Sequence, residues 1–109
     1  MAKLEYSPVA LEKLGAIHRY IDGDLQNPSG AVNTLSMIRE KVDSLKRMPK
    51  IGAPLSSRCA EIPEQFSDAR VLLCGQYLAV YLFDNNTVRV LAIYHTAEDY
   101  IRHLFEMYR

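Results

Sequence analysis

The stretch Arg70–Tyr100 constrains the fold more than any other, because it contains two very short turns between apolar runs. Gly75-Gln76 separates the first run from the second, and Asp84-Asn85-Asn86 separates the second from the third. Turns of two or three residues rich in Gly, Asn and Asp are the shortest way to reverse a strand. The stretch therefore predicts three consecutive antiparallel strands.

The middle run, Tyr77–Phe83, is apolar at every position and suits a central strand covered on both faces. In the third run, Thr87 and Arg89 share one parity, while Val88 and Val90 share the other. Such alternation is typical of a strand with one face on the core. We expect any site chemistry to lie where polar residues gather near this unit.

The totals exclude several classes of function. A chain of 109 residues is long enough for one domain. Its 13 basic and 13 acidic residues cancel, which gives no overall attraction for nucleic acid or an anionic membrane. No apolar run approaches the roughly 20 residues that span a bilayer, so we predict no membrane partner and a cytoplasmic location. The two cysteines and three histidines lack metal-like spacing, and neither a metal nor a cofactor is predicted.

Two amphipathic helices are predicted in the first half of the chain, after a short edge strand at residues 2–6. Ser7-Pro8 and Asn27-Pro28 are both typical helix starts, because the first residue caps free N–H groups and proline is tolerated next. The apolar stripes have spacings of three and four: Leu11, Leu14, Ile17 or His18, and Ile21 in one helix; Val32, Leu35, Ile38, Val42 and Leu45 in the other. Both stripes should pack on the sheet as a helical hairpin.

The remaining segments complete an α+β fold. Residues 49–68 contain Pro49, Gly52, Pro54 and Pro63 and predict a long loop, with a short strand near residues 58–62 as an option. Thr96 and Asp99 have the spacing of a capping box at the start of a last helix. The predicted order is β-α-α-β-β-β with a C-terminal helix, in a single domain over residues 1–109.

Several motifs resemble those of the RelE/ParE superfamily, the toxins of type II toxin–antitoxin systems. They are the opening strand with Ser7-Pro8, the segment MPKIGAPLS from Met48, the run RVLLCGQYLAVY from Arg70, and VLAIYH leading to Asp99-Tyr100. The resemblance covers nearly the whole chain. It implies a helical hairpin on a small antiparallel sheet and a cognate antitoxin whose tail wraps the toxin. Members similar to this one are often called plasmid stabilisation proteins.

The two branches of the superfamily imply different targets. RelE-like members cleave messenger RNA in the ribosomal A site, and ParE-like members inhibit DNA gyrase. The sequence interpretation favours a RelE-like, metal-independent mRNA interferase. A gyrase inhibitor and an inactive, antitoxin-binding member remain as alternatives.

Arg70, His95 and Tyr100 are the predicted catalytic residues. Arg70 matches the family's arginine at the start of this strand, and its planar, permanently charged fork suits a phosphate. His95 at a strand–helix junction and Tyr100 in the following helix have side chains suited to acid–base work. Each also has a structural interpretation: an ion-paired arginine, a hydrogen-bonded strand-end histidine, and a tyrosine packed on the sheet.

The chain departs from nuclease-like members directly after His95. Those members tend to place basic residues there, whereas this chain has Thr96-Ala97-Glu98. A carboxylate repels a nearby phosphate, which weakens the nuclease interpretation without weakening gyrase binding. Lys50 and Arg58 in the long loop are the cations that would restore local positive charge.

Overall fold

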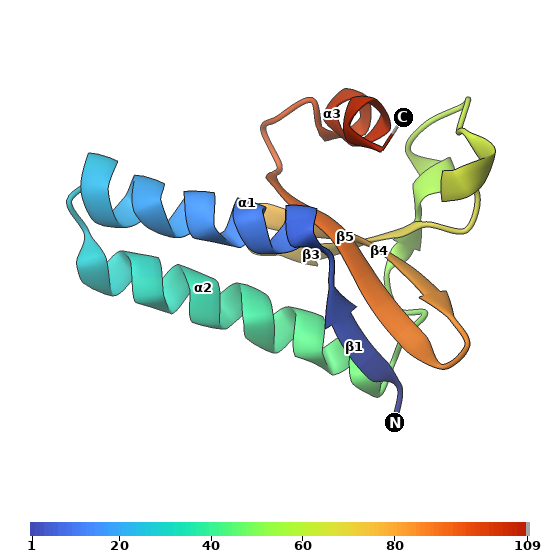
Figure 1. The fold of residues 1–109 in the computed structure, drawn as a ribbon, viewed down its shortest axis with the longest axis horizontal. Helices are drawn as coiled ribbons and strands as arrows, with labels where there is room; N and C mark the ends of the chain where they lie inside the picture. The colour runs from blue at the N-terminus through green and yellow to red at the C-terminus, as the bar shows by residue number, and fades with distance from the viewer. Residues whose placement is uncertain (109) are drawn as a thin grey trace.

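The computed structural model describes residues 1–108 and has the predicted α+β order (Figure 1). Its helices and strands are β1 Lys3–Tyr6, α1 Pro8–Arg19, α2 Pro28–Asp43, β2 Ala53–Pro54, β3 Arg70–Cys74, β4 Tyr77–Asp84, β5 Thr87–His95 and α3 Tyr100–Met107. Within the described chain, no helix combines the length and apolar character needed to cross a membrane.

The five strands form one sheet in the order β1-β5-β4-β3-β2. The three predicted strands pair antiparallel through both tight turns, and β1 joins the edge of β5 in parallel. Asn85 and Asn86 have φ values of 50° and 56°, as the tightest hairpin turn requires. The optional strand near residues 58–62 is not present; the extra strand is instead the two-residue β2, which pairs with the start of β3.

Both predicted helix starts are confirmed. Ser7 Oγ accepts a hydrogen bond from the Ala10 backbone N–H at 3.0 Å, and the Asn27 side chain accepts one from the Gly30 N–H at 3.0 Å. Proline follows each cap at the first helical position. The two helices then run antiparallel across one face of the sheet (Figure 1).

The core under this hairpin differs from the predicted stripes at two positions. Leu14, Ile38 and most of the other stripe residues are buried, and Ile17 and Leu35 are half-buried, but Leu11 is 50% exposed and Val32 is 57% exposed. Ala10 and Ala31, the residues directly before them, are fully buried. The buried line of each helix therefore runs through its alanine, and the next residue, about 100° further round the helix, points outward.

The opposite face of the sheet carries α3 and the segment that precedes β3 (Figure 1). Phe66 stacks on Phe105 with ring centroids 5.4 Å apart and meets Tyr108 edge-on at 6.0 Å. The Tyr108 hydroxyl donates to the Leu91 carbonyl oxygen at 2.6 Å. Leu91 is the residue of β5 that has no partner on β4 at the register shift between Val80 and Tyr81, so Tyr108 is fixed to an irregular point of the sheet.

The predicted capping box at the start of the last helix does not form. α3 begins only at Tyr100, and the Asp99 side chain makes no capping hydrogen bond. Instead the Glu98 carboxylate accepts a hydrogen bond from the His95 backbone N–H at 2.9 Å. The turn after β5 is therefore closed by Glu98.

Candidate functional site

Arg70, the first residue of β3, holds the loop that follows α2. Its Nη1 donates to the carbonyl oxygens of Gly52 at 2.7 Å and Lys50 at 3.1 Å. A guanidinium suits this task because it is always charged and presents several donors in one plane. The sequence interpretation missed this role because backbone carbonyl acceptors leave no residue signature in a sequence.

Tyr81, the cross-strand partner of Arg70 on β4, holds the same loop through its hydroxyl group. Its fully buried hydroxyl donates to the Pro49 carbonyl oxygen at 2.7 Å and accepts from the Gly52 N–H at 3.0 Å. Burial raises the pKa of Tyr81, while the Gly52 hydrogen bond and the Arg70 charge oppose this rise. Residue 52 has to be glycine here, because a Cβ atom would lie 2.7 Å from Tyr81 Oη.

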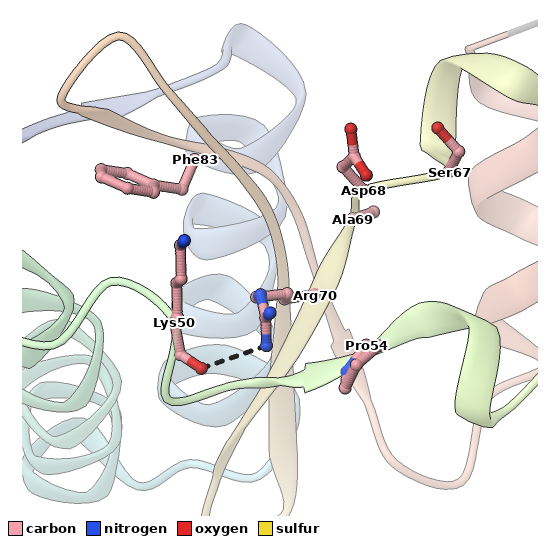
Figure 2. Close-up of a pocket in the computed structure, with 7 residues that line it drawn as sticks. All are labelled: Lys50, Pro54, Ser67, Asp68, Ala69, Arg70 and Phe83. Atoms are coloured by element: carbon pink, nitrogen blue, oxygen red, sulfur yellow. Dashed lines mark hydrogen bonds between the residues drawn. The ribbon is translucent and has the colours of Figure 1, made fainter.

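A hollow of about 300 Å³ lies beside this anchored loop (Figure 2). Lys50 and Arg70 are the two cations that line it, and Asp68 supplies a negative charge on the same wall. Phe83 of β4 also lines the hollow, and Pro54, Ser67 and Ala69 complete the lining. Arg58, the other loop cation singled out from the sequence, is exposed and does not line this hollow.

His95 ends β5 opposite Tyr77, and the two rings meet edge-on with centroids 5.1 Å apart. Its Nδ1 accepts a hydrogen bond from the Ala97 N–H at 3.0 Å. A ring nitrogen that accepts a hydrogen bond carries no proton, so this contact fits the neutral tautomer with the proton on Nε2. His95 lines a second hollow, at the other end of the sheet, and Glu98 is the one carboxylate-bearing residue that lines it too.

Tyr100, the first residue of α3, lies on the face of the sheet opposite the helical hairpin, where it packs against the core between α3 and the sheet. Its ring centroid is 6.3 Å from that of Tyr94 on β5. Tyr94 is fully buried, and its hydroxyl is the one buried side-chain polar atom without a hydrogen-bond partner among residues 1–108. Burial raises the pKa of Tyr94 to about 12.

Arg70, His95 and Tyr100, which the sequence predicts as one catalytic set, do not lie together. On β4, the partner of Arg70 is Tyr81 and that of His95 is Tyr77, four residues earlier. Four residues correspond to roughly 13 Å along the strand, and two strand spacings add about 10 Å across the sheet. Tyr100 packs on the opposite face. The strand register that separates Arg70 from His95 is not visible in the sequence, where one residue begins a predicted strand and the other ends one.

Positive charge is concentrated in one segment of this electrically neutral chain. Residues 44–60 contain Lys46, Arg47, Lys50 and Arg58 and no acidic residue. Lys46 pairs with Asp43 at 2.9 Å, which leaves the loop itself basic. Within the described part of the chain, no group of His, Cys, Asp and Glu side chains is placed to hold a metal ion.

A family model described as the ParE toxin of type II toxin–antitoxin system, parDE, matches residues 4–100. The chain belongs to the ParE toxin family. The match includes β1, the helical hairpin, all of β3, β4 and β5, and Tyr100. This ParE-family toxin is therefore the toxin of a type II toxin–antitoxin system. No curated protein sequence matches it significantly.

Solved structures confirm the RelE/ParE-like fold of this toxin. A structure described as the chromosomal ParDE TA system from P. aeruginosa superposes with a TM-score of 0.70 at 24% identity, covering 87% of this chain and 96% of that one. The RelBE2 toxin–antitoxin complex from Mycobacterium tuberculosis gives 0.61 at 17% identity, covering 86% and 96%. A YoeB–YefM toxin–antitoxin complex from Staphylococcus aureus gives 0.52 at 14%, covering 87% and 97%.

Proposed function

We propose that this ParE-family toxin arrests growth by binding DNA gyrase, the target that the ParE branch implies. One observation carries the proposal: Arg70, His95 and Tyr100 occupy three separate places on the sheet. RNA cleavage needs a phosphate contact and acid–base groups around the same few atoms. Inhibition by binding needs a surface and no such cluster. This reverses the order of preference that the sequence motifs favour.

The hydrogen bonds of Arg70 support the same proposal. A phosphate is held best when an arginine presents two parallel N–H donors to it. In Arg70, Nη1 is already shared between two backbone carbonyl oxygens. A phosphate that took the Nη1 donors would release the loop that Arg70 holds, so only Nε and Nη2 are left for one.

Electrostatics oppose a phosphate bound beside Arg70. Asp68 lines the same hollow as Arg70. Its carboxylate repels a phosphate in these partly desolvated surroundings. A protein partner with donors and apolar groups is not opposed in this way.

We also propose that a cognate antitoxin holds the toxin inactive. The similar structures from P. aeruginosa, M. tuberculosis and S. aureus are described as toxin–antitoxin systems or complexes. Leu11 and Val32 are exposed on the helical hairpin, where they offer apolar surface to a partner helix. Such a partner would bury side chains that the hairpin core leaves outside.

A RelE-like mRNA interferase is the second candidate, and one observation favours it. Lys50, Arg70 and Phe83 line a single hollow. Two cations suit a phosphate, and an aromatic ring is a stacking surface for an unpaired base. In this alternative Arg70 and Lys50 contact the phosphate together, and His95 and Tyr100 take no part at this hollow.

Expression of the full chain without antitoxin in a bacterial host tests the proposal. Growth arrest with an induced DNA-damage reporter and intact transcripts is the expected result. Arrest with new transcript 5′ ends inside codons, and no damage response, would contradict it in favour of the interferase. Normal growth with abundant folded protein would favour the inactive member.

A substitution of Lys50 separates the two toxic mechanisms further. Lys50→Ala removes a cation from the hollow, while the backbone carbonyl that accepts from Arg70 stays in place. An interferase should lose transcript cleavage and growth inhibition in parallel. The exposed Lys41, on α2, gives the matched control Lys41→Ala.

A further inference from the structure

A second hollow, of about 320 Å³, lies at the other end of the sheet, between α1 and the ends of β4 and β5. Its apolar lining residues, called its floor below, include the exposed Ala16, the half-buried Ile17 and the buried Ile93. Its rim is polar and carries Lys13, Tyr20, Tyr77, His95 and Glu98. An apolar floor with a few polar groups at the rim is the usual composition of a binding site.

The acidic group at this rim is already engaged. Glu98 Oε1 accepts from the His95 backbone N–H at 2.9 Å, and Oε2 lies 3.7 Å from His103 Nδ1. The carboxylate therefore closes the turn after β5, and both of its oxygens face nitrogen atoms of this chain. Its negative charge offsets part of the attraction of Lys13, so we expect only a small preference for an acidic ligand.

The free polar groups at the rim are donors. Among residues 1–108, the Lys13 ammonium has no carboxylate within ion-pair distance, and its Nζ lies 5.1 Å from the centroid of the Tyr94 ring. His95 uses Nδ1 as an acceptor, which leaves its Nε2–H free to donate. The hydroxyls of Tyr20 and Tyr77 make no hydrogen bond to another described side chain or backbone group.

We propose that this hollow binds a segment of a partner protein that places one large apolar side chain next to an aspartate or glutamate. The apolar side chain would sit on Ala16 and Ile17, and the carboxylate would face Lys13 and His95 Nε2–H. A volume of about 320 Å³ is at the lower end for small-molecule sites and suits a single anchoring side chain. The proposal holds for either target, because it uses none of the residues around Arg70.

Blocked dipeptides test the chemistry directly on the full-length protein. The probe is acetyl-Trp-Glu-amide, with acetyl-Trp-Gln-amide as the neutral match and acetyl-Ala-Glu-amide as the match without an apolar body. Amide chemical shifts in NMR spectra report both the site and the affinity. We expect shifts centred on Ala16, Tyr20 and Tyr77, with the Trp-Glu probe binding about threefold to fivefold more tightly than Trp-Gln, as a half-exposed ion pair implies.

Two variants assign these shifts to the hollow. Lys13→Gln should remove the preference for Glu over Gln, whereas Lys41→Gln, on an exposed part of α2, should keep it. Ala16→Phe should fill the hollow and abolish binding of both Trp probes. If Ala16→Phe unfolds the protein, the Lys13 pair still decides the outcome.

Three results would overturn the proposal. Equal binding of the Glu and Gln probes would show that the site does not recognise a carboxylate. Shifts spread over the whole surface would show that the probes do not bind in this hollow. Free indole-3-propionate binding as tightly as acetyl-Trp-Glu-amide would make the hollow a small-molecule site and exclude the polypeptide occupant.

Discussion

Arg70 and His95 lie toward opposite ends of the sheet, and each pairs with a tyrosine of β4 in different surroundings. At the Arg70 end, Tyr81 and Arg70 both hydrogen-bond to the backbone of residues 49–52. At the His95 end, Tyr77 meets His95 through a ring-edge contact and leaves its hydroxyl without a partner among the described residues. The Arg70 end is a structural anchor, called the anchored end below, and the His95 end is an open rim, called the open end.

This contrast shows why residue type alone is a poor guide to function in this chain. Arg70 has the chemistry of a phosphate ligand but holds a loop. Lys13, which no motif indicates, lines an open hollow with His95. The hydrogen-bond partners of a side chain, more than its chemical type, decide whether it is available to a ligand.

The largest effect is expected from Gly52→Ala at the anchored end. Its Cβ atom would lie 2.7 Å from Tyr81 Oη and 2.9 Å from the Val71 carbonyl oxygen, so the loop has to move and lose its hydrogen bonds. We expect the free energy of unfolding to fall by about 3 kcal/mol in urea titrations. Gly23→Ala is the control, since nothing lies within 4 Å of its Cβ position. Equal effects of the two substitutions would show that the loop is not held tightly.

Tyr81→Phe tests the anchor with a smaller change. It leaves the buried Pro49 carbonyl and Gly52 N–H without their partner, and the free energy of unfolding should fall by about 2 kcal/mol. Tyr77→Phe, at the open end, should change it by less than about 0.5 kcal/mol. If the two substitutions cost the same in denaturant titrations, the distinction between the two ends fails.

A smaller effect than at Tyr81, and one of opposite sign, is expected at Tyr94. Its buried hydroxyl has no partner among residues 1–108, so Tyr94→Phe removes an unsatisfied polar group and should raise the free energy of unfolding by about 1 kcal/mol at pH 7. A decrease instead would show that the hydroxyl is hydrogen-bonded in solution.

The same residue makes a pH-dependent contribution. Burial raises the pKa of Tyr94 from 10.0 to about 12. Between these values the folded state binds more protons than the unfolded state, so the free energy of unfolding falls as the pH rises through this window. Tyr94→Phe should lose less stability between pH 10 and pH 12 than the unsubstituted chain, and equal losses would exclude this cause.

Features with local causes were predictable from the sequence. The two tight turns and the Ser7-Pro8 and Asn27-Pro28 helix starts depend on a few adjacent residues, and all four form as expected. Features that depend on register or on backbone acceptors were not predictable. The separation of Arg70 from His95 follows from strand pairing, and the anchored loop depends on carbonyl oxygens that every residue has.

Helix packing and helix capping were predictable only in part. The three- and four-residue spacing of apolar residues predicted the buried centre of the hairpin, but the buried lines also run through Ala10 and Ala31 and leave Leu11 and Val32 exposed. Thr96 and Asp99 had suitable spacing for a cap, and Glu98 bonded the backbone of His95 instead. The Thr96 N–H, which a capping box would pair with Asp99, donates to the Gln76 carbonyl oxygen of the neighbouring strand turn, and sequence spacing does not reveal such a partner.

Purified components test the central claim, which is that this toxin acts by binding and has no assembled nuclease site. One preparation of the full chain is added to a DNA gyrase supercoiling reaction and to ribosomes translating a defined messenger RNA. The account predicts inhibited supercoiling and uncut messenger RNA. Messenger RNA cut at codons in the ribosome, with supercoiling unaffected, would contradict it.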